Sequence, residues 1–416
     1  MNSRLLPIVP IFERYLLART MAAVDDRGVV NKSNTLEGKS VLLGICGGIA
    51  ATESVKIARE LRRHGAKLSV IMTESSQKII TPLAIEWAAD TIVMTDWNSN
   101  MSQLENHDAI LICPATRNLL ANHAHGIMST PLLMALSSAR GREVPIVFAP
   151  SMHADLFNDP ITEKLQNELI RSGCEFIWGE RDEGKRKQMN PVSLVAEFTH
   201  IVNKSASNPK KIVITLGATK GSLDSVRHIQ NTSTGRTGWA IACELFRRGH
   251  DITVVSGETS ASPEFGLPLI IKAPEPNEML AELMALSKCE VDAWIHCAAV
   301  LDYVPKEPVK GKITSGSESL NVELVKTDKH IDILGEICEG AIRIGFKLEA
   351  NIEAEDLIIR AKEQIERAKM NAVVANNLDY LSGDKIRGIL VKSNGEEITL
   401  ANLEVLVSEL RKVIEE

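Results

Sequence analysis

The sequence lacks the features that mark nucleic-acid-binding and membrane proteins. Aromatic residues make up only 4% of its 416 residues, and no long basic run stands out among its 47 lysines and arginines. Unpaired bases would find few side chains to stack on, and a phosphate backbone would find no basic patch. No apolar stretch approaches the roughly 20 residues that cross a bilayer. We therefore expect neither a nucleic-acid nor a membrane partner.

Paired cysteines are also missing. None of the seven cysteines forms a CxxC motif, the usual sign of a metal or redox site, and several lie in apolar runs typical of strands. This scatter predicts buried free thiols in a reducing compartment, so we expect a cytoplasmic protein. Residues 1–37 are set apart as an N-terminal extension. Prolines and charges interrupt its apolar residues between Leu5 and Leu17, unlike a secretory signal, and Met21 is an alternative start.

Short apolar runs that alternate with helix-length segments fill the rest of the chain. This pattern predicts βαβ units and therefore parallel sheets. A polar, turn-forming stretch over residues 203–209 interrupts it. We predict an α/β protein of two doubly wound parallel-sheet (Rossmann-like) domains, 38–202 and 210–416, joined by that stretch as a linker. Ligands of such sheets bind at the carboxyl ends of the strands.

The first predicted strand, Ser40–Ile45, leads into a glycine turn and then a helical pattern. Glycines let the backbone approach an anion, and a helix N-terminus offers unpaired N–H groups. The turn is neither G-x-G-x-x-G nor a P-loop, so a phosphate site and a plain strand–helix connection both stay open. The residues that follow the first four predicted strands are Gly47, Gly48, Ile49 and Ala50, then Thr73, then Pro114, Ala115 and Thr116, then His153.

The order GGIAA, MTES, TPL, PATRN, AHG and PSMH resembles the FMN-containing cysteine decarboxylases, in particular the phosphopantothenoylcysteine decarboxylase half of the bifunctional coenzyme A flavoproteins. The resemblance covers about residues 38–201 and implies a flavodoxin-like fold. It implies that Gly47–Ala50 and Thr73 hold the FMN phosphate and that the PAT segment lies against flavin and substrate. The implied chemistry is oxidation of the substrate thiol by the flavin, loss of CO₂ and reduction of the enethiol.

The sequence departs from the bacterial pattern of this family at three points. The usual catalytic histidine aligns with Asn100, an amide that cannot act as an acid or base near neutral pH. The asparagine of PxMN is His153, and a clamp cysteine is missing near Gly179–Met189; both changes resemble the archaeal branch. We take His153 as the catalytic candidate, with His123 and His125 as alternatives, and a structural imidazole is the alternative for each. A ligase with a flavin-binding but inactive or regulatory N-terminal domain also stays open.

The second predicted domain carries polar segments after its strands. Residues 214–238 place a Thr/Ser/Gly cluster and Arg236 just before a helix, which suits a phosphate, although a plain N-cap loop is the alternative. A later strand ends near Ala298 and Asp302. Lys312 follows in the loop VPKEPVKGKI, where a flexible basic loop can close over polyphosphate or, alternatively, be solvated. GFKLE (345–349), Lys362 and VAN (374–376) come last.

The motifs TxGxT, D-x-V-R, I-x-N-x-S-x-G, AAVxDY, GKI, GFKxE and VAN resemble phosphopantothenate–cysteine ligases over about residues 210–416. The resemblance implies that CTP activates 4′-phosphopantothenate as an acyl-cytidylate that cysteine attacks, with Mg²⁺ on the nucleotide phosphates and no readable protein ligands. ATP-using relatives share much of this pattern, and homo-oligomers are implied for both domains. The implied residues are Asn231 and Lys312 for catalysis; Ala298, Asp302, Lys312, Phe346 and Lys362 for the nucleotide; and Asn231, Ser233, Gly235 and Arg236 for the substrate.

A short-chain dehydrogenase is the rival interpretation of the second domain. It requires G-x-x-x-G-x-G after the first strand and Tyr-x-x-x-Lys later. Neither the turn at Gly217 nor the segment after Tyr303 supplies these residues. The sequence therefore favours the ligase.

Overall fold

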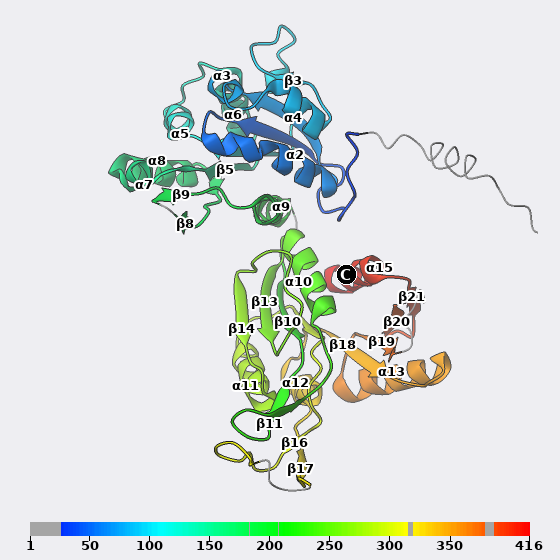
Figure 1. Cartoon of the computed structure of the whole chain (residues 1–416). Helices are drawn as coiled ribbons and strands as arrows, with labels where there is room; N and C mark the ends of the chain where they lie inside the picture. Colours follow the sequence, from blue (N-terminus) through cyan, green and yellow to red (C-terminus); the bar gives the residue numbers. More distant parts are fainter. Residues whose placement is uncertain (1–25, 183, 207, 315–318, 379–386) are drawn as a thin grey trace, which may run out of the picture. The chain divides into compact units, whose positions relative to one another are not determined.

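The computed structural model describes residues 26–182, 184–206, 208–314, 319–378 and 387–416. The chain divides into two compact units, Met1–Val195 and Ala196–Glu416. Each unit has one large β-sheet with helices packed on it (Figure 1). The predicted α/β class with parallel sheets is confirmed. The domain boundaries drawn from the sequence stay a prediction.

The sheet of the first unit is parallel throughout, with the strand order β3-β2-β1-β4-β5-β7. Strand β3 contributes only two residues at the edge. The five longer strands have the order 2-1-3-4-5 of flavodoxin-like folds, whose switch point lies between β1 and β4. The strands are β1 (Ser40–Ile45), β2 (Lys67–Met72), β3 (Val93–Met94), β4 (Ala109–Ala115), β5 (Ile146–Pro150) and β7 (Cys174–Phe176).

Four helices of the first unit start at a threonine cap. Thr73, Thr81, Thr116 and Thr130 each cap a helix, their hydroxyls accepting a backbone N–H of the first turn. The helices are η1 (Ile49–Glu53), α2 (Ser54–Arg63), α3 (Glu74–Gln77), α4 (Pro82–Ala89), η2 (Ser102–Leu104), α5 (Arg117–Ala124), α6 (Pro131–Gly141), α7 (Ala154–Asn158) and α8 (Pro160–Arg171). A small antiparallel sheet joins β6 (Met152–His153), β9 (Lys185–Arg186) and β8 (Arg181–Asp182).

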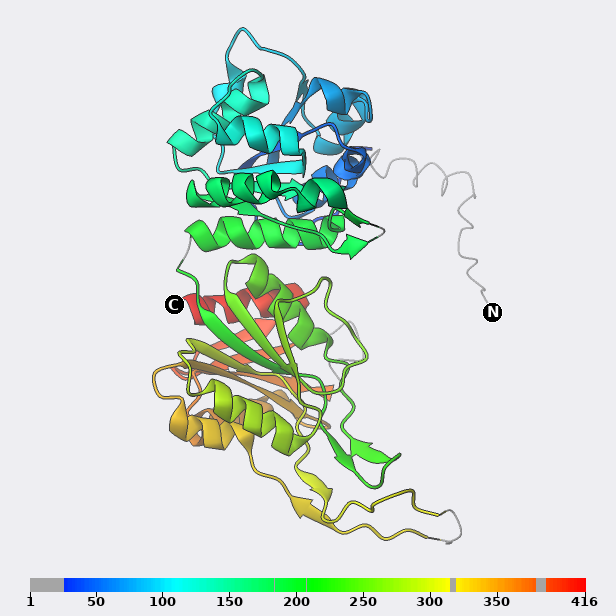
Figure 2. The ribbon, with the colours of Figure 1, turned by 90° about the vertical axis from the view of Figure 1, so that its left-hand side faces the viewer.

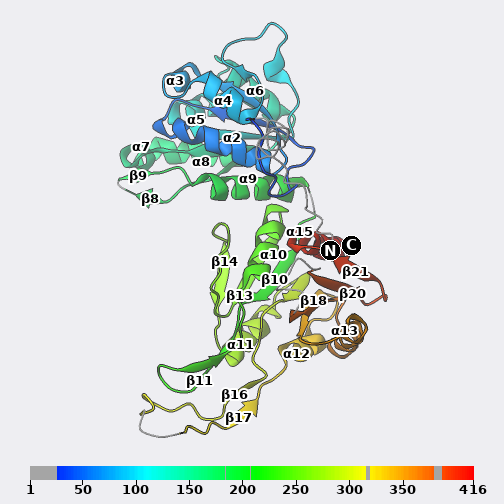
Figure 3. The same ribbon diagram turned by 45° about the vertical axis from the view of Figure 1, so that its right-hand side comes forward.

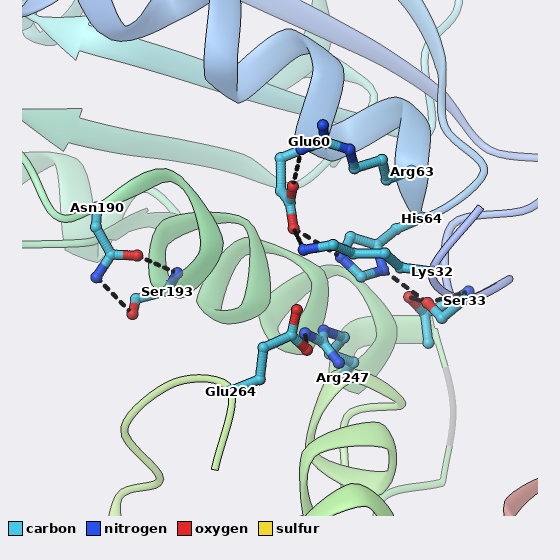
Figure 4. Close-up of polar contacts among 10 residues, drawn as sticks. Lys32, Ser33, Glu60, Arg63, His64, Asn190, Ser193, Arg247 and Glu264 are labelled. Carbon is cyan, nitrogen blue, oxygen red and sulfur yellow. Dashed lines mark hydrogen bonds and ion pairs between the residues drawn. The ribbon is translucent and has the colours of Figure 1, made fainter. Parts of the chain in front are cut away.

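A buried carboxylate ties the segment before β1 to helix α2. The Glu60 side chain is 1% exposed, and its carboxylate accepts hydrogen bonds from Lys32 at 2.7 Å and Arg63 at 2.8 Å (Figure 4). His64 Nε2 lies 3.5 Å from the same carboxylate, and Ser33 Oγ bonds to His64 Nδ1 at 2.7 Å. Burial alone would raise the pKa of Glu60, but these partners outweigh it and hold that pKa well below its usual range. Residues 1–25, with the expected apolar segment and alternative start, lie outside the described residues.

The second unit has an eight-stranded sheet, β14-β13-β10-β15-β18-β19-β20-β21. Its first six strands are parallel and follow the Rossmann order 3-2-1-4-5-6, with the switch point between β10 and β15; β20 and β21 add an antiparallel edge. The strands are β10 (Lys211–Leu216), β13 (Asp251–Ser256), β14 (Leu269–Lys272), β15 (Ala293–His296), β18 (Ile342–Glu349), β19 (Ala372–Asn377), β20 (Gly388–Lys392) and β21 (Glu397–Leu400).

Two antiparallel hairpins extend from this unit away from its sheet (Figures 2 and 3). They are β11 (Lys220–Ser222) with β12 (His228–Gln230), and β16 (Tyr303–Pro305) with β17 (Leu324–Lys326). The helices are α9 (Pro191–Ala206), which begins in the first unit, α10 (Arg236–Arg247), α11 (Pro276–Leu286), α12 (His330–Ile337), α13 (Ala354–Ala368) and α15 (Leu403–Glu415).

The stretch expected as a linker, residues 203–209, begins inside helix α9, which continues to Ala206. Asn203 is buried there, and its amide donates to the Arg247 carbonyl at 2.7 Å. This tertiary contact overrides the modest helix propensity of the Asn and Ser residues. Residue 207 lies outside the described residues.

The seven cysteines are all free. Cys46, Cys113, Cys174 and Cys243 are buried, as expected, whereas Cys289 is exposed and the remaining two are half-buried. None of the helices in the described ranges has the length and apolarity that crossing a bilayer requires.

We predict that Glu60→Gln lowers the free energy of unfolding of the first unit by about 2–3 kcal/mol at pH 7, because Lys32 and Arg63 then face a neutral group. The pKa of Glu60 is lower in the folded protein than in the unfolded chain. Its stabilisation is therefore complete above the ordinary carboxyl pKa and is lost as the pH falls toward the folded value. Hydrogen exchange of α2 amides should show a difference between variant and wild type that shrinks toward acid pH.

The matched control is Glu74→Gln, since Glu74 is 89% exposed and pairs with Lys78 at 3.3 Å on the surface. It should leave exchange in α2 unchanged at every pH. Equal effects of the two substitutions would contradict the role given to Glu60.

Candidate functional site

The residues expected to bind FMN lie at the switch point of the first sheet, at the carboxyl ends of its strands. Gly47 and Gly48 follow β1, and the PAT segment ends β4 beside it. The Cys46 N–H donates to the Pro114 carbonyl at 3.2 Å, and the Thr73 N–H donates to the Ile45 carbonyl at 3.0 Å. These bonds hold the ends of β1, β2 and β4 together.

The turn after β1 has the shape of an anion cradle. A Cβ on Gly47 would lie 2.3 Å from the Ser75 hydroxyl, so only glycine fits there. The turn leads into η1 at Ile49, and the first N–H groups of a helix have no partner within it. Burial raises the pKa of the Cys46 thiol to about 12, so no thiolate charge opposes an anion. The donor set therefore fits a phosphate.

Thr73 and Thr116 contribute hydroxyls to the same edge, but both also cap helices. Thr73 Oγ1 accepts from the Ser76 N–H at 3.3 Å and lies 3.2 Å from Ser75 Oγ. Thr116 Oγ1 accepts from the Leu119 N–H at 3.3 Å. Capping uses only a lone pair of each hydroxyl, and the Thr73 hydroxyl donates its proton to the Ile45 carbonyl at 3.4 Å, so this proton would have to turn away from that carbonyl to reach a ligand.

His153 lies at this edge and is exposed. It follows Pro150, which is in register with Ala115 of the PAT segment. Its Nδ1 accepts from the Asp155 N–H at 3.4 Å and lies 3.1 Å from the Asp155 carboxylate. Strand β9 lies in the segment Gly179–Met189, which lacks the clamp cysteine. It pairs with β6, so this segment lies directly beside His153.

The other histidine candidates and Asn100 are not brought to the PAT segment by any described contact. His123 is buried near the end of α5, two turns from Thr116, and neither ring nitrogen has a hydrogen-bond partner among the described residues. Burial, assisted by Arg140, lowers the pKa of His123 to about 4, so this ring is neutral at pH 7. His125 is exposed beyond the same helix, and Asn100 caps a local turn by accepting from the Ser102 N–H at 3.0 Å. The structure favours a structural role for His123.

In the second unit, the loops that leave β10, β13 and β15 are bonded to one another. Ala218 bridges to both Glu258 and Ala299, and Thr219 Oγ1 accepts from the Leu301 N–H at 2.8 Å. The Asn231 amide donates to the carbonyls of Ala299 and Val300, each at 3.2 Å. Asn231 therefore lies within a few residues of Asp302, at one edge of the sheet.

The residues expected to bind substrate follow Asn231 at the N-terminus of α10. Gly235 caps this helix with a left-handed φ of 76°, and a Cβ there would lie 2.6 Å from Thr259. Ser233 Oγ accepts from the Gly235 N–H at 3.4 Å, and Arg236 is exposed. A polar loop, a helix N-terminus and a guanidinium thus meet beside Asn231, as an anion requires.

Three of the expected nucleotide residues share the same edge. Ala298 donates its N–H to Thr215 Oγ1 of β10 at 3.3 Å. Phe346 lies one residue beyond Gly345, which is in register with the last residue of β15. Asp302 is exposed and pairs with Lys329 at 2.6 Å, a partner that the sequence did not single out.

Lys312 belongs to the segment between β16 and β17 and lies beside the tip of the β11–β12 hairpin. Its two neighbours are held there: the Gly311 carbonyl accepts from the Ser225 N–H at 3.0 Å, and the Ile313 N–H donates to Asp224 Oδ2 at 2.9 Å. Asp224 also accepts from Arg227 Nη1 at 2.8 Å, and these bonds, led by the one from Ile313, lower its pKa to about 2. Asn231 follows the last residue of β12 and so lies at the base of the same hairpin.

Lys362 is the expected nucleotide residue that the structure does not bring to this edge. It lies in the middle of α13 and pairs with Glu397 at 2.8 Å. Glu397 is in register with Val391, and Val391 with Val373, near the start of β19. The helix returns toward the amino ends of the strands before Lys362 is reached, so its role at the nucleotide stays a prediction.

Arg387 is a residue that the sequence analysis missed, and its side chain bonds to Thr237 in the first turn of α10. In the sequence, Arg387 is a single arginine just before a short predicted strand, and such a position does not indicate a function. Among the described residues, no group of three or more His, Cys, Asp and Glu side chains is placed to hold a metal ion.

Comparisons with known proteins cover both units. Residues 29–238 match the family described as Flavoprotein, and residues 207–414 match the DNA/pantothenate metabolism flavoprotein C-terminal domain. The coenzyme A biosynthesis bifunctional protein CoaBC of Thermococcus kodakarensis is 36% identical over 368 residues, 86% of this chain and 90% of its own. Its namesake from Methanocaldococcus jannaschii is 30% identical over 397 residues, 92% and 96% of the two chains.

Among solved structures, the DNA/pantothenate metabolism flavoprotein from Streptococcus pneumoniae matches 49% of this chain and 98% of its own, with 26% identity and a TM-score of 0.46. The family assignment depends on the sequence relatives, which extend across both units and include archaeal proteins. They confirm the resemblance inferred from the motifs. The chain belongs to the family of coenzyme A biosynthesis bifunctional proteins, which join a flavoprotein domain to a DNA/pantothenate metabolism domain.

Proposed function

We propose that the second unit joins cysteine to 4′-phosphopantothenate at the expense of CTP, and that the first unit decarboxylates the product to 4′-phosphopantetheine with FMN. The ligase reaction has two steps. The carboxylate attacks the α-phosphate of CTP, forming an acyl-cytidylate and releasing pyrophosphate. The amine of cysteine then attacks the acyl carbon, and CMP leaves as the amide forms.

The observation that carries the proposal is the pair of hydrogen bonds from the Asn231 amide to the loop after β15. It joins the polar loop before α10, which suits the acid, to the segment Ala298–Asp302, which suits the nucleotide. Reacting groups held side by side react as if at very high concentration, which is the main help that a ligase gives to two anionic reactants. Both N–H groups of the amide are engaged, so Asn231 acts first by positioning the loop.

Cations would neutralise the charge that builds up on the phosphates. The Arg236 guanidinium lies at the N-terminus of α10 beside Asn231, and Lys312 is carried by the β16–β17 loop. Lys312 is exposed beside the β11–β12 hairpin tip, so the proposal requires this tip and residues 311–313, which it holds, to move together toward the triphosphate. Mg²⁺ carried by the nucleotide phosphates would add further positive charge without needing protein ligands.

For the first unit, the cradle of Gly47–Ala50 with Thr73 would hold the FMN phosphate, and the PAT segment would face the isoalloxazine ring. When bound, FMN supplies the oxidation of the substrate thiol that lets CO₂ leave. His153 follows Pro150, which is in register with Ala115 of the PAT segment, and would serve as the acid–base group of the reaction. We also propose homo-oligomers, in keeping with the exposed Ile49 (78%) and Leu83 (75%) near the FMN edge.

A second candidate is a ligase whose flavin-binding first unit is inactive or regulatory. Asn100 favours it, because this amide replaces the usual acid–base histidine and sits in a local turn of its own. The two candidates differ in a single product. The ligase with an inactive first unit stops at phosphopantothenoylcysteine.

The first prediction from the proposed function concerns the products and Asn231. Incubation of the full chain with 4′-phosphopantothenate, cysteine, CTP and Mg²⁺ should yield pyrophosphate, CMP and 4′-phosphopantetheine, identified by mass. Asn231→Asp should reduce the ligase rate at least about a hundredfold, because a carboxylate cannot donate to the two carbonyls and repels an anionic substrate. A variant with the full ligase rate would show that the site is misplaced.

The second prediction concerns FMN. Gly47→Ala should weaken FMN binding at least about tenfold, since its Cβ would collide with Ser75 and distort the cradle. Flavin absorbance after dialysis measures the loss, and ligase activity should be unchanged. Gly141→Ala is the matched control, because nothing lies within 4 Å of a Cβ at that helical position. Equal FMN content in both variants and the wild type would refute the cradle.

The third prediction concerns Asp224, which holds the residues on both sides of Lys312. Asp224→Asn retains one acceptor oxygen but loses the charge, so Gly311–Ile313 should exchange amide hydrogens faster and the ligase kcat should fall about tenfold. Activity should not change with pH through this group above about pH 4, because its pKa of about 2 keeps it ionised.

The control for this experiment is Glu290→Gln, a carboxylate that is 92% exposed and pairs with Lys211 at 3.1 Å. It should change neither exchange nor kcat. Faster exchange in Asp224→Asn with an undiminished kcat would separate the loop from catalysis and contradict the role of Lys312.

A further inference from the structure

A second guanidinium lies beside the α10 N-terminus. Arg387 directly precedes β20, which runs antiparallel to β19, so this residue lies at the edge where the parallel strands end. Its N–H donates to the Leu400 carbonyl at 2.6 Å, which fixes the backbone. Its side chain reaches the first turn of α10, where Nη2 donates to Thr237 Oγ1 at 2.5 Å. Thr237 is the neighbour of Arg236 in the chain.

The two arginines bring positive charge together with no described counter-ion. Arg387 is half-buried and Arg236 is exposed, and neither forms an ion pair with a carboxylate of the described residues. Burial lowers the pKa of Arg387, the neighbouring Cys297 thiol opposes this, and the charge of Arg236 lowers the pKa further. A guanidinium nevertheless stays protonated in proteins. The N-terminus of the twelve-residue helix α10 adds the positive end of its dipole.

We propose that Arg387 and Arg236 together bind a phosphate group of one reactant, an inference that depends on the ligase function proposed above. The bond to Thr237 uses one of the five N–H groups of Arg387 and leaves the others for a ligand. Guanidinium forks match phosphate oxygens in pairs, and an anion between them removes the repulsion of the two cations. Two reactants carry such a group: the nucleoside triphosphate and the 4′-phosphate of the acid.

The position of Arg387 is compatible with either reactant. Cys297, whose thiol is close enough to influence Arg387, directly follows β15 and precedes Ala298. Arg236 follows the polar loop that begins at Asn231. Arg236 therefore follows the segment assigned to the acid, and Arg387 is bonded to the first turn of the same helix.

The test compares Arg387→Ala and Arg387→Lys with the wild-type full chain. The KM for CTP, for 4′-phosphopantothenate and for cysteine are measured separately, and the thermal midpoint checks folding. Arg387→Ala should raise the KM of one phosphate-bearing reactant at least about tenfold, as the loss of a charged hydrogen bond does, and should leave the KM for cysteine unchanged. Arg387→Lys keeps the charge without the fork and should show a smaller rise.

The matched control is Arg367→Ala on α13, an arginine that pairs with Asp332 at 3.1 Å on the surface. It should leave all three KM values within twofold. A rise for CTP assigns the triphosphate, and a rise for the acid assigns its 4′-phosphate. Should the alanine variant fail to fold, the lysine variant decides by the same values.

Three unchanged KM values in a folded Arg387 variant, or a rise for cysteine alone, would overturn the inference. A wild-type chain that makes no phosphopantothenoylcysteine would instead refute the ligase function. The two failures are therefore distinguishable in one set of assays.

Discussion

Hydrogen bonds between loops that leave neighbouring strands are the constraint on which the second unit depends. Parallel strands bring their carboxyl ends to one edge, but the loops beyond them are free to diverge unless something joins them. Here Ala218, in the loop after β10, bridges to the loops after β13 and β15, and the Asn231 amide adds two bonds to the loop after β15. In the proposed function, the acid and the nucleotide need this closeness, since both are anions that repel each other in solution.

The two candidate sites provide for an anion in different ways. Around the glycine cradle of the first unit, burial keeps the Cys46 thiol neutral, so that backbone N–H groups and hydroxyls meet an anion without competition. In the second unit, full charges are used instead: Arg236 and Arg387 lie at the edge, and Lys312 is held nearby on a hairpin. In the proposed function, the single phosphate of a bound cofactor and a triphosphate that must react and leave call for these different solutions.

Much of this architecture was predictable because short-range sequence patterns indicate the strands and helices. Apolar runs alternating with helices predicted both sheets. Residues that follow these runs lie at the carboxyl ends of the strands, where ligands of parallel α/β sheets bind. Residues placed by a strand end, such as Gly47, Asn231 and Ala298, were therefore found. Their roles remain proposals.

What the sequence did not reveal depends on contacts between distant segments. The pairing of Lys362 with Glu397 was not predictable, because motif order says nothing about where along a helix a side chain leaves the sheet edge. The tie of Asp224 to the Lys312 loop joins residues 89 positions apart, and that of Arg387 to Thr237 joins residues 150 apart. The helix through Ala206 exists because Asn203 finds a buried partner, which propensity alone does not predict.

The most direct measurement is a crystal structure of the full chain with 4′-phosphopantothenate, a non-hydrolysable CTP analogue and Mg²⁺. The account predicts that the acid carboxylate and the α-phosphate lie next to each other, between the loop at Asn231 and the segment Ala298–Asp302. A nucleotide bound at the amino ends of the strands, or an acid and a nucleotide in separate clefts, would contradict it.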